Sequence, residues 1–206
     1  MKEIMRTKIK ICGLRSEEDI RAINEVHPDY AGFILFPGSR RYVTDPQLEH
    51  LVKLLDPGIL PVGVFVNEEP ERVAGLLNAG RIGAAQLHGN EDEKYMEKLR
   101  GLTGGQLWKA FRIDTAADVR KALCFPADAV LLDHGAGGTG EAFDWELLRG
   151  TRKEYFLAGG LNCGNIAAAL RKLCPAGVDV SSGVETDGKK DPEKIREFVR
   201  IVRELK

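Results

Sequence analysis

The sequence predicts an α/β protein, a single-domain (β/α)8 TIM barrel that spans residues 1–206. Short apolar runs alternate with longer amphipathic stretches along the whole chain, which is the pattern of parallel strands joined by crossover helices. The alternation repeats about eight times at roughly 25 residues a unit, whereas an open doubly wound sheet more often has about five or six strands. A length of 206 residues suits one such domain.

Eight apolar runs predict the strands of the barrel. They cover residues 9–12, 31–36, 60–66, 84–87, 107–111, 129–132, 155–158 and 178–180. The working residues of such a barrel come from the C-terminal strand ends and the loops after them. These eight ends therefore predict where residues remote in the sequence gather into one site.

Amphipathic stretches between the strands predict the helices. They cover residues 16–26, 46–55, 70–79, 92–99, 116–123, 165–173 and 192–205, with a shorter helix at 144–148. Several begin with residues that favour a helix start. Ser16 is followed three residues later by Asp19, and Asp45 and Asp191 each precede a proline at the first helical position.

The composition argues against several classes of partner. Hydrophobic residues make up 43% of the chain and charged residues 30%, with a formal net charge of -1. No strong field gathers polyanions, so we expect no nucleic-acid partner. No apolar run approaches the roughly 18 residues that span a bilayer, and the first residues lack an apolar signal segment. We therefore expect no membrane contact and a cytoplasmic location.

The four cysteines have no C-x-x-C spacing, so they predict neither a metal cluster nor a dithiol motif. Cys124 and Cys174 come near helix ends and are predicted to be small buried or capping residues, and Cys163 also has a structural interpretation. Cys12 differs because it stands where the first strand runs out into Gly13. Its thiol should lie at the mouth of the barrel, where a thiolate can act as a base or nucleophile.

The last two strands predict an anion site. Gly159 and Gly160 follow the seventh strand, and Ser181, Ser182 and Gly183 follow the eighth. Glycines let backbone N–H groups approach an anion closely, and loops after strands seven and eight are a recurrent phosphate site in this fold. The alternative is that the glycines only form a tight turn and the serines only cap a helix. Both motifs occur in the expected units, which favours phosphate.

Asp133 ends the sixth strand and precedes residues 134–140, which contain four glycines. Beside apolar strand residues, desolvation disfavours the carboxylate, so this side chain could hold a proton to donate. Its structural alternative is a helix or turn cap. The glycine-rich segment favours function, since such a loop could close over a substrate and reopen.

Further polar residues follow other strands. Arg40 and Arg41 lie in the loop after the second strand, where one guanidinium could fork onto a carboxylate, although solvated surface arginines are the common case. His88 ends the fourth strand, and a lone histidine is more often a hydrogen-bonded structural group than a catalyst. We expect His88 and Asp179, which lies in the eighth strand, to line the site.

With these residues in hand, the sequence resembles the phosphoribosylanthranilate isomerase family. The matching stretches run in order along the chain: residues 10–13, 32–33 with 39–42, 62–67, 86–89, 132–133 with 138–140 and 143–145, 159–161, and 178–185. They cover nearly the whole chain, and their combination is specific. The residues before Thr7 look like an extension.

The resemblance implies an enzyme without metal or organic cofactor. It implies that N-(5'-phosphoribosyl)anthranilate, a small phosphosugar, is converted to its 1-deoxyribulose isomer by an Amadori rearrangement. It further implies that Cys12 is the general base, that Asp133 is the general acid, and that Arg41 contacts the anthranilate carboxylate. The last two loops would then hold the phosphate. The chain would be a monomer or a homodimer.

Other phosphosugar proteins fit the sequence less well. A related ribosyl-carboxamide isomerase is expected to have an aspartate in place of Cys12, and indole-glycerol-phosphate synthase a longer chain with other reacting residues. A non-catalytic phosphosugar-binding protein would not need both Cys12 and Asp133.

Period-two alternation also puts Lys10 on the same face of the first strand as Cys12, so we expect its ammonium to lower the pKa of the thiol.

Overall fold

The structure is a computed structural model that describes residues 6–133, 145–151 and 153–205. Its barrel strands are β1 (Lys8–Cys12), β2 (Tyr30–Ile34), β3 (Leu60–Phe65), β4 (Ala84–Leu87), β5 (Gln106–Arg112), β6 (Ala129–Asp133), β7 (Phe156–Leu157) and β8 (Gly177–Val180). The α-helices are α1 (Glu17–Val26), α2 (Asp45–Val52), α3 (Pro70–Asn78), α4 (Glu93–Leu102), α5 (Ala116–Cys124), α6 (Ile166–Leu173) and α7 (Pro192–Glu204). Two short 3-10 turns are η1 (Trp145–Leu148) and η2 (Ser182–Val184), and a hairpin is formed by β9 (Glu185–Thr186) and β10 (Lys189–Lys190).

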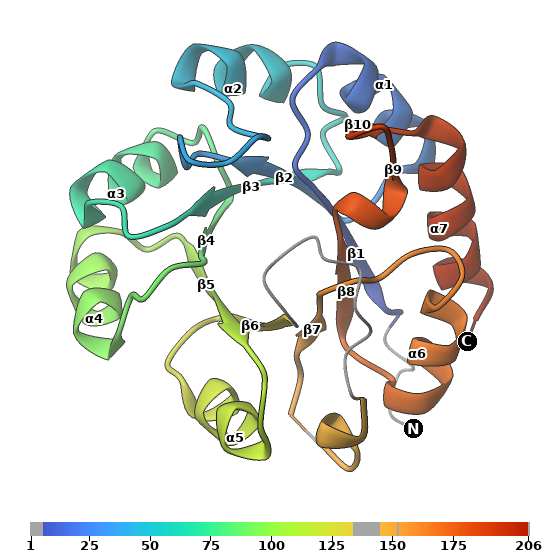
Figure 1. Cartoon of the computed structure of the whole chain (residues 1–206). Coiled ribbons are helices and arrows are strands. Elements are labelled where there is room, and N and C mark those ends of the chain that lie inside the picture. The colour runs from blue at the N-terminus through green and yellow to red at the C-terminus, as the bar shows by residue number, and fades with distance from the viewer. Residues whose placement is uncertain (1–5, 134–144, 152, 206) are drawn as a thin grey trace.

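The eight strands β1 to β8 pair in parallel in chain order, and β8 pairs with β1 to close the ring. Figure 1 views this ring along its axis, with α1 to α7 around the outside. The predicted barrel is therefore confirmed, and each predicted strand lies within two residues of the observed one. The short helix expected at 144–148 is a single 3-10 turn over its described part.

Two of the predicted helix starts are confirmed. The Ser16 hydroxyl accepts a hydrogen bond from the Asp19 N–H, and the Asp19 carboxylate accepts one from the Ser16 N–H, so the two residues form a capping box. Asp191 caps α7 by accepting from the N–H groups of Glu193 and Lys194. These side chains occupy donors that the first helical turn cannot use itself.

The start and the end of α2 differ from the prediction. Thr44, not Asp45, is the N-cap, because Thr44 and Gln47 form a capping box one residue earlier. Asp45 is the first helical residue instead. The helix ends at Val52 rather than at residue 55, and tight turns that continue to Leu55 precede a Pro-Gly pair.

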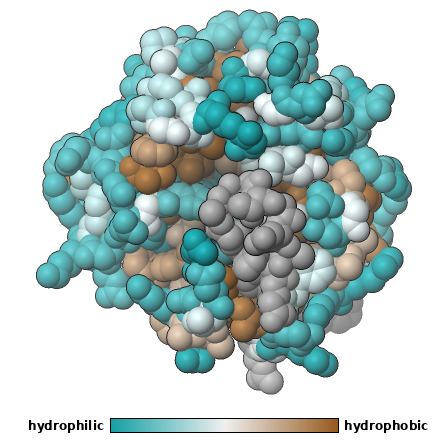
Figure 2. All heavy atoms as spheres, viewed as in Figure 1, coloured by the Kyte–Doolittle hydropathy of each residue, from teal (hydrophilic) through white to brown (hydrophobic). Residues whose placement is uncertain are grey.

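Alternation along the strands divides the apolar residues into two layers. Within β5, Leu107 belongs to the large core between the strands and the helices, whereas Trp108 and Ala110 belong to a second cluster inside the barrel. The members of the inner cluster are Tyr30, Val62, Ala84, Trp108, Ala110, Leu131 and Phe156. Trp145 packs against the outer core, so both tryptophans are packing residues. Figure 2 shows that hydrophilic residues cover most of the face seen in Figure 1.

The cysteines outside the site are only partly as predicted. Cys174 caps α6 in a left-handed conformation, with φ of 47°. Of the predicted alternatives, buried or capping, the cap is confirmed for Cys174, whereas neither Cys124 nor Cys174 is buried. Cys163 is half-buried. Within the described part of the chain, we find no helix whose length and apolar character would allow it to cross a membrane.

Candidate active site at the C-terminal rim

The two residues with the strongest chemical signal lie at the same rim of the barrel. Cys12 is the last residue of β1 and Asp133 is the last residue of β6. All eight strands run in the same direction, so their C-terminal ends form one rim. Around the ring, β7 and β8 lie between β6 and β1. Around the rim, the loops after β7 and β8 therefore lie between Asp133 and Cys12.

Cys12 lies in a buried, charged environment. Lys10 lies two residues before Cys12 in β1. Its side chain is fully buried, and its ammonium lies 3.0 Å from Asp179 Oδ1. Burial raises the pKa of the Cys12 thiol, the Lys10 ammonium opposes this rise, and the Asp179 carboxylate adds to it. The net pKa lies above its ordinary value. The expected lowering by Lys10 is thus present as one contribution, and burial outweighs it.

Gly32 makes room for the thiol. It pairs with Cys12 across β1 and β2, and a Cβ added to Gly32 would lie 2.8 Å from Cys12 Sγ. A carbon atom cannot be accommodated at that distance without moving the sulfur. Gly13, the residue after Cys12, has φ of 80°, and a Cβ there would lie 2.5 Å from Arg41 Cδ. Two glycines therefore allow the thiol and the Arg41 side chain to occupy this rim.

Asp133 pairs with His88 across the top of the barrel. His88 Nε2 lies 3.3 Å from Asp133 Oδ2, and Gln86 Nε2 lies 3.3 Å from His88 Nδ1. Because the Gln86 amide nitrogen donates to Nδ1, the proton of the neutral ring lies on Nε2 and faces Asp133. Asp133 Oδ1 is buried and has no hydrogen-bond partner among the described residues. His88 and Asp133 also line a cavity of about 350 Å³ together with Arg112.

The predicted anion loops contact each other. Gly159 and Gly160 both have positive φ, 84° and 65°, so they do form a turn that other residues adopt rarely. A Cβ added to Gly183 would lie 1.8 Å from the Leu161 carbonyl oxygen. Only glycine permits this close approach of the loop after β8 to the loop after β7. The two loops thus present their backbones side by side.

Ser181 joins the ends of β8 and β1. Its hydroxyl donates to the Cys12 carbonyl at 3.0 Å and forms no capping hydrogen bond with η2, which Ser182 begins. The capping alternative is therefore wrong for the Ser181 side chain. The Lys190 ammonium donates to the Ser181 carbonyl at 2.9 Å. These contacts place a buried cation beside the residues predicted to hold phosphate.

Arg41 is not a solvated surface arginine. Its Nε and Nη2 donate to the two oxygens of Glu185, at 2.7 and 2.8 Å, and only 14% of its side chain is exposed. Lys190 Nζ also lies 2.7 Å from Glu185 Oε1. Burial favours a raised pKa for Glu185, but the two cations outweigh it and lower this pKa to about 2. Arg40 lies at the exposed edge, 3.6 Å from Glu185.

Glu185 and Lys190 were not predicted from the sequence. They belong to the β9–β10 hairpin, whose turn residues Asp187 and Gly188 both have positive φ, 52° and 73°. Asp-Gly is a strong signal for a two-residue hairpin turn, so the sequence did contain the information. Gly32 and Gln86 had no comparable local signal, because only the closed barrel brings them to the site.

The remaining predictions concern the glycine-rich segment after β6 and metal binding. The glycine-rich segment 134–140, predicted to close over a substrate, lies outside the described residues. Across residues 6–133, 145–151 and 153–205, no group of three or more His, Cys, Asp and Glu side chains is placed to share a metal ion.

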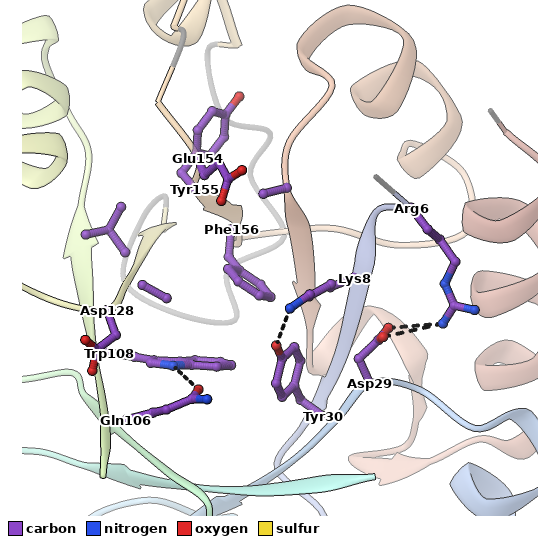
Figure 3. Close-up of a pocket in the computed structure, with 13 residues that line it drawn as sticks. Arg6, Lys8, Asp29, Tyr30, Gln106, Trp108, Asp128, Glu154, Tyr155 and Phe156 are labelled. Carbon is purple, nitrogen blue, oxygen red and sulfur yellow. Dashed lines mark hydrogen bonds and ion pairs between the residues drawn. The ribbon is translucent and has the colours of Figure 1, made fainter. Parts of the chain in front are cut away.

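A larger cavity, of about 660 Å³, lies at the opposite end of the barrel. Its lining includes the first residues of several strands, among them Lys8, Tyr30 and Phe156. Figure 3 shows the Tyr30, Trp108 and Phe156 rings grouped there, with the Lys8 ammonium 3.2 Å from the Tyr30 hydroxyl. The residues that line this cavity include none of those predicted to act. The candidate chemistry therefore belongs to the other rim, despite the smaller cavity there.

Comparisons with known proteins agree with this architecture. Residues 9–201 match the model of the family described as N-(5'-phosphoribosyl)anthranilate (PRA) isomerase. A relative of that name from Clostridium acetobutylicum is 44% identical, over 97% of this chain and 99% of its own. A crystal structure of phosphoribosyl anthranilate isomerase from Thermotoga maritima is 35% identical, with a TM-score of 0.89, and covers 97% of this chain and 100% of its own.

A second solved structure adds a ligand. It is a phosphoribosyl anthranilate isomerase in complex with reduced 1-(o-carboxyphenylamino)-1-deoxyribulose 5-phosphate. It is 34% identical to this chain, with a TM-score of 0.85, and covers 97% of this chain and 100% of its own.

Proposed function

Since the chain belongs to the N-(5'-phosphoribosyl)anthranilate isomerase family of tryptophan biosynthesis, we propose that Cys12 is the general base and Asp133 the general acid of this isomerisation. One observation carries the proposal. Around the rim, Asp133, the two glycine-containing loops and Cys12 follow one another in the order β6, β7, β8 and β1. A ribose held by its phosphate at these loops would have an acid on one side and a base on the other.

The reaction then proceeds by two proton transfers. Asp133, in its protonated form, gives a proton to the ring oxygen as the bond between that oxygen and C1' breaks, and the anthranilate nitrogen forms a Schiff base with C1'. The Schiff base acidifies the proton on C2', which the Cys12 thiolate removes. The resulting enolamine takes up a proton at C1' while its C2' hydroxyl gives one up, and so becomes the C2' ketone. Substrate and product are isomers, so no oxidant or reductant is needed.

The phosphate is assigned to the loops after β7 and β8. Gly159 and Gly160 have positive φ in the loop after β7, and Ser182 begins the η2 turn in the loop after β8. Lys190 supplies a cation at the same place. Backbone N–H groups with a nearby positive charge are well suited to a phosphate dianion.

The anthranilate carboxylate is assigned to Arg41. Glu185 occupies the Nε and Nη2 side of the guanidinium, which fixes its plane and leaves Nη1 for a ligand. The buried salt bridge thus orients the arginine before the substrate arrives. His88 and Asp179 complete the substrate site, His88 beside the acid and Asp179 beside Lys10.

The decisive experiment removes the acid and the base separately. We expect Cys12→Ala and Asp133→Asn each to lower kcat by at least about a hundredfold, since each loses one proton transfer. The assay follows the decay of anthranilate fluorescence when the substrate is generated in situ. Binding of the reduced deoxyribulose phosphate analogue, measured by calorimetry, should persist in both variants. Near-normal turnover in either variant would contradict the role assigned to that residue.

A further inference from the structure

A buried ion pair lies behind the rim, outside the residues assigned to the reaction. Lys109 Nζ is 3.1 Å from Glu91 Oε2, and only 4% and 1% of their side chains are exposed. Lys109 follows the inward-facing Trp108 in β5, so alternation directs its side chain to the outside of the barrel. The pair therefore lies between the sheet and the helices and does not face the interior of the barrel.

Energetics do not explain why an ion pair occupies this position. Burying two charges costs several kcal/mol per ion, and apolar residues of similar volume are often as stabilising or more so. Burial indeed lowers the pKa of Lys109, although Glu91 opposes the shift. A role other than stability accounts better for charges at this place.

The pair joins backbone groups from two loops of the rim. Glu91 Oε1 accepts from the Asn67 N–H after β3, at 2.7 Å, and Glu91 Oε2 accepts from the Gly89 N–H after β4, at 2.9 Å. Lys109 donates to the Gly89 carbonyl at 2.8 Å. Both polar groups of Gly89, the neighbour of His88, are thus held by one ion pair. Little freedom remains for the backbone that carries the His88 ring.

The two loops also hold each other. The Asn67 side-chain oxygen accepts from the Asn90 N–H at 2.7 Å, and Asn67 itself has a left-handed φ of 51°. A Cβ added to Gly89 would lie 2.4 Å from that same oxygen. Such an over-determined loop is typical of a place where a side chain must be held accurately.

We propose that the Glu91–Lys109 pair is a positioning device that holds His88 against Asp133. The inference rests on the proposed function, in which Asp133 is the acid. A shift of His88 by a fraction of an ångström would lengthen the 3.3 Å contact between its Nε2 and Asp133 Oδ2. The effect would appear in the proton transfer rather than in the affinity for the phosphosugar.

The test compares Glu91→Gln, the double variant Glu91→Met with Lys109→Met, and the conservative Lys109→Arg. The double variant removes both charges together, which keeps the fold if the single variant unfolds. We expect kcat to fall about ten- to a hundredfold in the first two, with KM changed less than about threefold. Lys109→Arg should recover most of kcat.

Two readouts separate positioning from mere support of the fold. Glu91→Gln should have little further effect on kcat when His88 is already Asn, because it acts through that ring. Nitrogen NMR of the His88 ring should show loss of the Nε2–H form in the double variant. A matched control is Lys98→Met, which removes an exposed lysine paired with Glu71 at 2.8 Å and should change neither readout.

The failures of the two proposals are distinguishable. If Asp133→Asn keeps normal turnover, the assignment of the acid is wrong. If Asp133→Asn is inactive while the Glu91 and Lys109 variants keep wild-type kcat and His88 ring signals, the positioning role alone is overturned. An unchanged penalty of Glu91→Gln in the His88→Asn background would also overturn it.

Discussion

The thiol of Cys12 is surrounded by opposing electrostatic effects. Burial and Asp179 favour the neutral thiol, whereas Lys10 and Lys190 favour the thiolate. In the proposed mechanism the base must be a thiolate, so the two lysines support the reactive form against the desolvation that the barrel imposes. Lys10 cannot be exchanged freely, since it also compensates the Asp179 carboxylate at 3.0 Å.

This arrangement predicts the effect of Lys10→Met. The variant loses the cation beside the thiol and leaves Asp179 without its partner, and both changes raise the pKa of Cys12 further. The rate of alkylation by iodoacetamide, measured against pH, should therefore rise at higher pH than in the wild type. Equal titration curves for the two proteins would show that Lys10 does not act on the thiol.

The sequence allowed the location of a single residue to be predicted where its position in a strand determines its surroundings in the fold. Cys12 and Asp133 were predicted at strand ends, and the structure brings both to one rim. The net pKa of Cys12 could not be predicted, because it depends on burial and on Asp179 in β8. Gln86 was missed for a similar reason, since its hydrogen bond to His88 depends on side-chain geometry.

At the scale of elements, the β9–β10 hairpin supplies two charged side chains near Arg41. Glu185 pairs with Arg41, and Lys190 pairs with Glu185. Glu185 begins β9 and Lys190 ends β10, and they pair across the hairpin. The eight barrel strands were predictable, because apolar runs of strand length recur along the chain. The hairpin was not predicted, because two-residue strands of charged residues carry no apolar pattern and only their Asp-Gly turn signals them.

The low pKa of Glu185 predicts how acid affects stability. A carboxyl whose pKa is near 2 in the folded protein, below its ordinary value of 4.5, stabilises the fold above about pH 4.5 and loses this contribution as pH falls towards 2. The difference in unfolding free energy between wild type and Glu185→Gln, from urea unfolding, should thus shrink as the pH falls from about 5 to about 3. The control is Glu71→Gln, which removes the carboxylate of an exposed ion pair with Lys98. A difference that stays constant with pH would contradict the assigned ion pairing.

At the scale of the whole molecule, the barrel separates stability from chemistry. The aromatic cluster at the N-terminal end includes Tyr30 and Trp108, whose ring centroids are 4.7 Å apart, and Trp108 and Phe156, at 5.1 Å. Cys12 and Asp133 lie at the other end of the strands. The N-terminal ends of the strands therefore contribute mainly to packing, and the C-terminal ends of the same strands carry the reactive groups.

Trp108→Ala tests this separation. Trp108 is 2% exposed, so removing its ring should lower the free energy of unfolding by about 3–5 kcal/mol. The folded fraction should keep kcat within about threefold of the wild type, because the ring lines the cavity at the end of the barrel opposite the site. Urea unfolding and turnover per folded molecule check the two parts. A large loss of kcat at unchanged stability would show that the inner cluster acts on the site.

Closure of the ring has a consequence for synthesis of the chain. The ammonium of Lys10 meets its carboxylate partner 169 residues later, and the hydroxyl that binds the Cys12 carbonyl is equally distant. On a ribosome, the thiol emerges early but its surroundings are completed only when residues 177–190 have followed. A nascent chain halted before that point would carry an unshielded sulfur and no isomerase activity, which makes the last quarter of translation the step that creates the enzyme.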